Sequence, residues 1–565
     1  MGTPAGTTTS AAAGAIASAT TGNAPGLVTR GTAAATASGG SAPGVPAAAR
    51  RESALAMDPA HFRALGHGLV DRIADELAQL HERPADPHPA PAALRARLGA
   101  ARGLPSEGED AAALLEDAAA LLFDHSPPGG HPRFLVYVAA APAPIGVLAE
   151  LLAAALNANV ALWRAAPAAA EIEAQTLRWL AELVGFPAGG GGLLTSGGNA
   201  ANAIALHLAL CARLPRFRDD GLDGARLAVY ASDQTHGWLH KAVEQAGLGA
   251  RALRWIASDA RQRLRVEALA DAIAADRAAG VVPLMAVGNA GTVGTGAVDP
   301  LGALAALCRE HGLWLHVDGA YGAPAACLLG SPHAAALGDA AADLAALSEA
   351  DSLALDPHKW LSAPIEAGGL LVREPGRLSH AYGRHRPSYY DPAGEAGVEE
   401  FEDDGAGAAA QAAAGARGAP ADTLAGPDFY ALGPQNTRGF RALKVWLALR
   451  MAGREGYRRI VADDIALAQR LFEGVAAAPS LEAVTRQLGV VTFRARPPDL
   501  DDPAALDALN RALLARLRRE GDVVLSPAHL DGRFLLRACL VNFRTTAEDV
   551  DRVAARLAAA ATGGR

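Results

Sequence analysis

Lysine is scarce in this sequence. Only three of its 51 basic residues are lysines, namely Lys241, Lys359 and Lys444, and the rest are arginines. Arginine stays protonated, whereas a desolvated lysine can lose its proton and form a Schiff base with a carbonyl. A lysine kept in such a composition is therefore a candidate for chemistry that arginine cannot perform. On composition alone, the better explanation is that each lysine is present by chance. Whether one of them has a chemical role must therefore be judged from the residues around it.

Cysteines and long apolar runs are also few. The four cysteines, Cys211, Cys308, Cys327 and Cys539, lack metal-ligand spacing. We therefore expect that the cysteines form no metal site and that their thiols are reduced, as in a cytoplasmic protein. The longest uncharged apolar run, 134–149, contains two prolines and is too short to cross a bilayer. With a net charge of −9 over 565 residues and no basic block, neither nucleic acid nor a membrane surface is expected as a partner.

Composition and periodicity divide the chain into segments. Residues 1–56 are mostly Ala, Gly, Thr, Ser and Pro, which predicts a disordered low-complexity leader. Helical spacing of apolar residues predicts an N-terminal helical segment over 57–140. Short apolar strands alternate with helices over 141–435, which predicts a large α/β domain with a mostly parallel sheet. Within it, the Ala/Gly-rich residues 405–425 predict a flexible insertion, and 436–565 are expected to form a smaller α+β domain.

Several elements can be placed along the sequence. We expect strands at residues 193–195, 227–231, 281–287, 313–317, 368–373, 490–494 and 534–543. We expect helices at 110–123, 148–161, 168–184, 236–246, 301–311 and 436–450. Ligands of parallel α/β sheets bind beyond the carboxyl ends of the strands, so the residues after each strand matter most.

Four polar motifs stand at such strand ends. Residues 195–199, Thr-Ser-Gly-Gly-Asn, lead into a helix, and the free N–H groups of a helix start favour an anion such as phosphate. His236 follows the strand at 227–231, and Asp318 ends the strand at 313–317. Lys359 comes last in order. Taken singly, each motif has a plain explanation as a glycine turn, a capping histidine, a turn aspartate or a leftover lysine.

Together the four motifs meet the needs of pyridoxal 5'-phosphate: a lysine for its aldehyde, an anion site and an acid opposite its ring nitrogen. Five further motifs indicate which family of pyridoxal-phosphate proteins the sequence resembles. They are residues 131–134, 290–292 with 299–300, 316–321 (His-Val-Asp-Gly-Ala-Tyr), 356–360 (Asp-Pro-His-Lys-Trp) and 541–546. In these motifs the chain resembles the group II pyridoxal-phosphate-dependent amino acid decarboxylases, of the aromatic L-amino acid decarboxylase kind. The resemblance runs from about Met57 to Arg556.

The resemblance implies a fold and an assembly. The fold is type I of the pyridoxal-phosphate enzymes, similar to aspartate aminotransferase. The assembly is a homodimer with shared active sites, in which the segment 57–140 packs on the partner subunit. The activity implied is decarboxylation of an L-amino acid.

The resemblance also implies residue roles. Lys359 would hold the cofactor aldehyde, and Asp318 would pair with the ring N–H, which keeps the ring an electron sink. His236 would stack on one face of the ring and Ala320 on the other. The phosphate would be held by Gly198, Asn199, Ser352 and His358, and Thr292 would lie near the cofactor and the substrate carboxylate. Asp356 stands where the family can carry an amide, and since an aspartate would repel phosphate we interpret it as structural.

The family's proton donor is a loop tyrosine, and Tyr389 is the better match. Tyr390 remains possible, and both could instead be packing residues. Tyr137 and Trp163 are expected in the substrate site, Trp163 within a segment that the partner subunit contributes. The resemblance implies an aromatic substrate such as tryptophan, phenylalanine, tyrosine or DOPA. Glutamate is less expected, because no clear arginine is available for a side-chain carboxylate.

Three alternatives stay open at this stage. The chain could decarboxylate a non-aromatic amino acid, or it could be an aldehyde synthase or an aminotransferase on the same fold. Tyr389 and His236 argue against the synthase, since aldehyde producers in this family characteristically lose one of them. A non-catalytic binding protein is the remaining class, and the intact Lys359, Asp318 and His236 argue against it.

Overall fold

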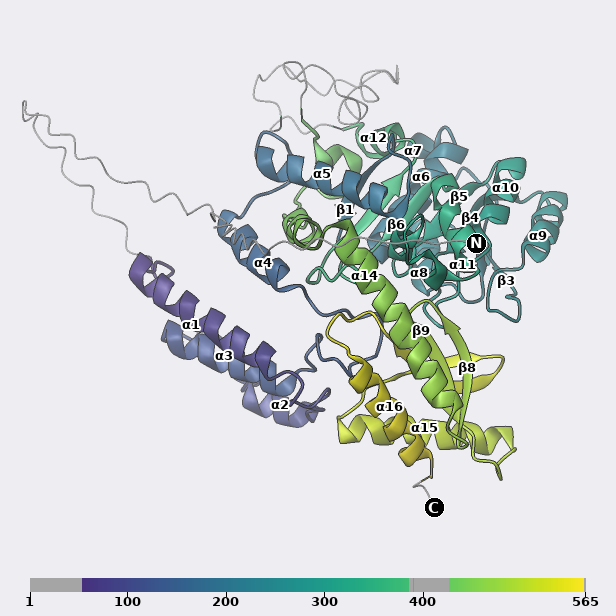
Figure 1. Ribbon diagram of the computed structural model, residues 1–565. Helices are drawn as coiled ribbons and strands as arrows, with labels where there is room; N and C mark the ends of the chain where they lie inside the picture. Colours follow the sequence, from purple (N-terminus) through teal and green to yellow (C-terminus); the bar gives the residue numbers. More distant parts are fainter. Residues whose placement is uncertain (1–52, 386–389, 391–425, 563–565) are drawn as a thin grey trace, which may run out of the picture. The chain divides into compact units, whose positions relative to one another are not determined.

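The computed structural model describes residues 53–385, 390 and 426–562 (Figure 1). The chain divides into two compact units, Met1–Phe62 and Arg63–Arg565. Helix α1 (Pro59–Ala78) begins in the first unit, and the remaining elements belong to the second. The predicted leader lies outside the described residues up to position 52, as does the predicted insertion at 405–425.

A seven-stranded sheet forms the centre of the second unit. Its strand order is β1-β7-β6-β5-β4-β2-β3. The neighbours β3, β2, β4, β5 and β6 pair in parallel, while β7 runs antiparallel to both β6 and β1. The strands are β1 (Gly191–Thr195), β2 (Leu227–Ser232), β3 (Leu253–Ile256), β4 (Val282–Asn289), β5 (Trp314–Asp318), β6 (Ser352–Leu355) and β7 (Gly368–Val372).

Helices cover this sheet, which explains its apolar strands. Every residue of β2, β6 and β7 is buried, as expected for strands of a sheet that is covered on both faces. Helix α6 contacts β1, β4, β5, β6 and β7, so it crosses the sheet (Figure 1). The α-helices around the sheet are α4 (Pro144–Leu156), α5 (Pro167–Val184), α6 (Gly198–Arg213), α7 (Phe217–Asp220), α8 (Trp238–Gln245), α9 (Val266–Ala278), α10 (Leu301–His311), α11 (Ala340–Ala345) and α12 (Gly376–Tyr382).

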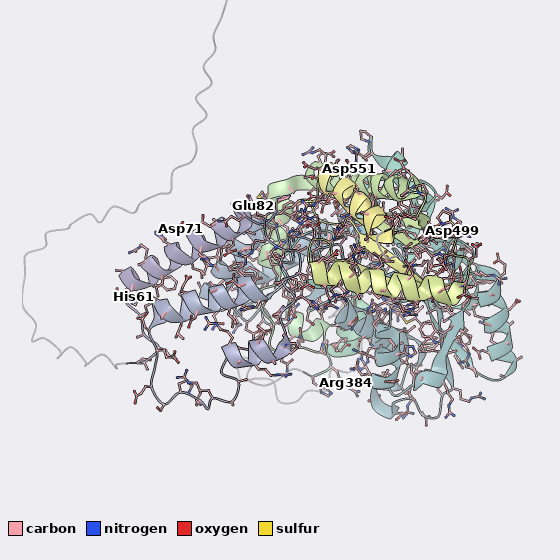
Figure 2. All side chains as sticks on the ribbon, turned by 90° about the horizontal axis from the view of Figure 1, so that it is seen from below. His61, Asp71, Glu82, Arg384, Asp499 and Asp551 are labelled. Atoms are coloured by element: carbon pink, nitrogen blue, oxygen red, sulfur yellow. The ribbon has the colours of Figure 1, made fainter. Side chains whose placement is uncertain are left out.

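The C-terminal part carries a second core around an antiparallel sheet. The strand order is β10-β11-β9-β8, with β8 (Leu481–Gln487), β9 (Val490–Ala495), β10 (Ser526–Leu530) and β11 (Arg533–Cys539). Helices α15 (Pro503–Glu520) and α16 (Ala547–Thr562) contact each other through Arg516, whose Nη1 donates to the Ala560 carbonyl at 3.5 Å. Asp551 lies on α16 (Figure 2). It accepts two hydrogen bonds from Arg470 of α14 (Ala442–Ala476) at 2.6 and 2.7 Å.

Shorter elements complete the described chain. The N-terminal helices are α2 (Pro91–Arg97) and α3 (Ala111–His125). The 3₁₀ turns are η1 (Ala250–Ala252), η2 (Ala323–Leu328), η3 (Ala334–Leu337), η4 (Ala346–Glu349) and η6 (Phe429–Leu432).

The α/β class predicted from the sequence, with a mostly parallel sheet and a smaller α+β part, is confirmed. The sequence pattern does not predict β3 or β6, which have only four residues each. The helix expected at 436–450 is α14, which begins at Ala442 and runs to Ala476. It contacts α4 and α5 as well as α16 and β8, so it joins both cores. The predicted division into domains therefore stays a prediction.

One buried ion pair explains why α14 begins late. Arg438 and Glu173 of α5 form a salt bridge in which both side chains are 1% exposed. Arg438 also donates to the carbonyls of Val160 and Leu194, both at 2.9 Å. Glu173 accepts from the Leu194 N–H at 2.9 Å. The segment before α14 is thus tied to α5 and β1 through side chains, outside a helix.

We predict that Glu173→Gln destabilises the fold strongly. The amide can still accept from Leu194, but Arg438 keeps a buried charge without a counter-ion, which costs about 3–5 kcal/mol. The control is Glu182→Gln on the same helix, because Glu182 pairs with Arg454 at the surface and such pairs contribute roughly 0–1 kcal/mol. Equal losses of unfolding free energy in denaturant titrations would contradict this account.

Candidate active site

The predicted site residues gather at one edge of the large sheet. Since β2, β4, β5 and β6 are parallel, their carboxyl ends meet there. Asp318 is the last residue of β5, and Lys359 follows β6 after a short turn. His236 follows β2 and Thr292 follows β4. Helix α6 begins at the same edge, directly after β1.

Lys359 is held by an acid three residues before it. Its Nζ lies 3.0 Å from Oδ2 of Asp356, and its side chain is 26% exposed. Asp356 is buried, and its other oxygen, Oδ1, has no hydrogen-bond partner. The other two lysines are placed differently: Lys241 is exposed on α8, and buried Lys444 pairs with Glu150 at 2.7 Å. Lys359 alone combines a position at the strand edge with access from outside.

The Asp318 carboxylate is surrounded by hydrogen-bond donors. Its Oδ2 accepts from Nε1 of Trp238 at 2.7 Å and from Nδ2 of Asn202 at 3.2 Å. Its Oδ1 accepts from the Ala320 N–H at 3.2 Å. These three hydrogen bonds hold the carboxylate in one orientation at the end of β5.

The start of α6 approaches the lysine turn closely. A Cβ added to Gly198 would lie 3.0 Å from Oδ2 of Asp356 and 3.2 Å from Cβ of Ala320. A Cβ on Gly197, the N-cap residue, would lie 3.7 Å from Cε1 of His358. No side chain caps this helix start, so its first N–H groups are available to an anion. Asn199, also predicted to bind phosphate, is exposed in the first turn.

His236 and Thr292 lie in the loops after β2 and β4. His236 is exposed, and its Nδ1 accepts from the Trp238 N–H at 3.2 Å, which orients the ring. The Thr292 hydroxyl is buried and is 2.9 Å from the Thr295 hydroxyl, and it accepts from the Ala297 N–H at 3.1 Å. Thr292 thus closes its own turn, and its hydroxyl is engaged there.

The position of Ser352 does not fit its predicted role as a phosphate ligand. It is the first residue of β6, whereas the lysine turn follows the last. Its Oγ lies 2.8 Å from both Nε1 of Trp314 and Nδ1 of His316, and the side chain is fully buried. Strand β6 therefore places Ser352 at the opposite end from Lys359.

The predicted substrate residues are not brought together within this chain. Tyr137 is exposed, and Trp163 donates from Nε1 to Glu171 at 2.9 Å. Neither makes a hydrogen bond to another predicted site residue. Tyr389 lies outside the described residues. Tyr390 is described, and its hydroxyl donates to the Asn436 carbonyl at 3.2 Å.

Sequence reasoning missed three residues that shape the site: Asn202, Trp238 and Asp356. Asn202 could have been noticed as a polar residue within an apolar helix. Trp238 had no signal, because its contact with Asp318 spans 80 residues of sequence. Asp356 was interpreted as structural, and its contact with Lys359 was not foreseen.

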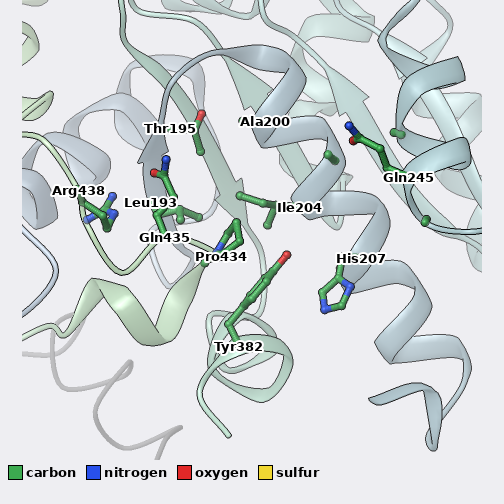
Figure 3. A pocket seen from close by; sticks show the side chains of 14 residues that line it. Leu193, Thr195, Ala200, Ile204, His207, Gln245, Tyr382, Pro434, Gln435 and Arg438 are labelled. Carbon is green, nitrogen blue, oxygen red and sulfur yellow. The ribbon is translucent and has the colours of Figure 1, made fainter. Parts of the chain in front are cut away.

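A cavity of about 450 Å³ lies beside α6, and Thr195, His207 and Tyr382 are among the residues that line it (Figure 3). The rings of His207 and Tyr382 pack against each other with centroids 4.9 Å apart. None of the predicted site residues lines it.

The described ranges contain no group of three or more His, Cys, Asp or Glu side chains that could hold a metal ion. Within the same part of the chain, no helix is both long and apolar enough to span a membrane.

The residues at the strand edge fit pyridoxal phosphate chemically. They supply a reachable lysine, a carboxylate held by N–H donors and an uncapped helix start.

Comparisons with known proteins agree with this assignment. The sequence model of the pyridoxal-dependent decarboxylase conserved domain matches residues 91–393. The chain is 33% identical to an aromatic-L-amino-acid decarboxylase of Bacillus atrophaeus, over 90% of this chain and 97% of the relative. It is 34% identical to a tyrosine decarboxylase of Oryza sativa subsp. japonica, over 88% and 90%. The solved structure of Oryza sativa TDC with PLP and tryptamine superposes with a TM-score of 0.78 at 26% identity, covering 91% of this chain and 99% of that one. The chain therefore belongs to the pyridoxal-dependent decarboxylases, carboxy-lyases of fold type I whose cofactor is pyridoxal phosphate.

Proposed function

We propose that this enzyme decarboxylates an aromatic L-amino acid, releasing CO₂ and the corresponding amine. The observation that carries the proposal is the convergence of Lys359, Asp318 and the start of α6 at one edge of the sheet. When bound, pyridoxal phosphate supplies an electron sink for the bond that breaks at Cα.

Each residue at this edge has a proposed task. Lys359 binds the cofactor aldehyde, and Asp318 faces the ring nitrogen. The α6 start with Gly198 and Asn199, together with His358, holds the phosphate. The faces of the ring are covered by His236 and Ala320, and Thr292 lies near the substrate carboxylate.

The aromatic substrate is supported by the names of the relatives and by Tyr137 and Trp163. The experiment is a panel of the common L-amino acids with the cofactor added, in which both CO₂ and amine are measured. Tryptophan, phenylalanine, tyrosine or DOPA should give equal amounts of the two products. Turnover of glutamate or histidine in preference to these would overturn the aromatic assignment.

We also propose a cytoplasmic homodimer with shared active sites. Four leucines of α4 form a stripe at helical spacing and are 51–60% exposed, and they are Leu148, Leu151, Leu152 and Leu156. An exposed apolar stripe of this kind marks an interaction site. A second copy of the chain is the proposed occupant, with Trp163 delivered to the neighbouring site. All four cysteines are buried and free, which suits a reducing compartment.

The dimer predicts the effect of a charge in this stripe. Leu152→Arg should convert the dimer to monomer in analytical ultracentrifugation and remove most activity, because the buried charge would oppose association. The control Met451→Arg changes another exposed apolar residue, 64% exposed and outside the stripe. If Leu152→Arg stays dimeric and active, α4 is not the interface.

The loop tyrosines predict a change of product. After CO₂ leaves, Cα must take up a proton, and a positioned acid speeds such a transfer by roughly 10²–10⁴-fold. Tyr389→Phe should therefore lose most amine formation while CO₂ release continues, with dioxygen consumed and aldehyde and ammonia appearing. Tyr390→Phe is the matched control, because its hydroxyl already donates to Asn436. The reverse pattern would make Tyr390 the donor.

A further inference from the structure

A chain of buried hydrogen bonds ends on the Asp318 carboxylate. It starts at Trp314, whose Nε1 lies 2.8 Å from the Ser352 Oγ. Ser352 Oγ lies 2.8 Å from Nδ1 of His316, and the other ring nitrogen, Nε2, lies 2.7 Å from Oδ1 of Asn202. Nδ2 of Asn202 then reaches Oδ2 of Asp318 at 3.2 Å. The chain thus links β5, β6 and α6.

The donor directions follow from the Asn202 end. Nδ2 of Asn202 donates to Asp318, so Oδ1 faces His316, and because an amide oxygen only accepts, Nε2 of His316 carries the ring hydrogen. Nδ1 of the neutral ring is then an acceptor, so Ser352 donates its single hydrogen to Nδ1 and accepts from Trp314. Every donor in the chain therefore points toward the carboxylate.

Burial keeps the side chains of this hydrogen-bond chain neutral. Ser352 and His316 are 0% exposed and Asn202 is 1% exposed. Burial lowers the pKa of His316 to about 4, so the ring carries no charge at neutral pH. The chain thus gives Asp318 an oriented dipole and no competing cation. The charge of Asp318 remains available for a cation on its open side.

We propose that Asn202 is a positioning residue, oriented by His316 and Ser352, that keeps the Asp318 carboxylate directed at the ring nitrogen of the cofactor. The inference rests on the proposed function, in which Asp318 faces that nitrogen. It also gives Ser352 a different task from phosphate binding. The alternative is that these hydrogen bonds have only a structural role, in which they hold β5, β6 and α6 together.

The test compares two cofactors on the apoenzyme: pyridoxal phosphate and its carbocyclic analogue, in which a C–H group replaces the ring nitrogen. Dissociation constants are measured by equilibrium dialysis. The wild type should bind pyridoxal phosphate more tightly than the analogue. Asn202→Leu should weaken binding of pyridoxal phosphate about tenfold and leave binding of the analogue within about twofold. A merely structural loss would weaken both cofactors equally.

Two further variants keep the test decisive. Ser352→Ala is a small change that removes the far end of the chain, and it should weaken only pyridoxal phosphate. If Ser352 instead held the phosphate, both cofactors would bind less tightly. Asn510→Leu is the matched control, because Asn510 is a fully buried asparagine of α15 that bonds only to the backbone of Ala495 and Leu506. Asn510→Leu should leave the dissociation constants of both cofactors unchanged, even where it lowers the melting temperature.

The outcomes separate the two claims. If the wild type does not distinguish the cofactors, Asp318 does not face the ring nitrogen, and the proposed site and this inference both fail. If the wild type distinguishes them and both Asn202→Leu and Ser352→Ala keep the full difference, the inference alone is wrong.

Discussion

Parallel pairing of β2, β4, β5 and β6 is the constraint on which the site depends. Parallel strands have their carboxyl ends at the same edge, so residues more than 100 positions apart in the sequence lie near one another in space. Strand β7, antiparallel to both neighbours, lets β1 join with its carboxyl end at that edge. The start of α6 is thereby brought to the lysine turn. Chemistry that needs a lysine, an acid and an anion site follows from this arrangement.

The two carboxylates at this edge are treated differently by their surroundings. Asp318 accepts hydrogen bonds from neutral N–H donors. One oxygen of Asp356 contacts Lys359, and the other has no hydrogen-bond partner. A buried oxygen without a partner is costly, so a ligand that supplies a donor there would be stabilised. The surroundings therefore fix the orientation of Asp318, whereas Asp356 holds the lysine.

Much of this arrangement was predictable, and the failures have physical causes. The apolar strands followed by His236 and Asp318 could be found because buried parallel strands leave continuous apolar runs, whereas the short strand before Lys359 was not predicted. Ser352 was assigned to the phosphate from the family resemblance, and the sequence did not show that it begins a strand of only four residues that Lys359 follows. The role of Asn202 depends on three side chains from other elements, which no local pattern records.

The most direct test of the account is the position at which the cofactor is attached. The holoenzyme would be reduced with borohydride, digested, and its peptides mapped by mass spectrometry. The account predicts the label on Lys359, which lies at the strand edge and is reachable from outside. A label on exposed Lys241, or on Lys444 despite its ion pair with Glu150, would contradict it.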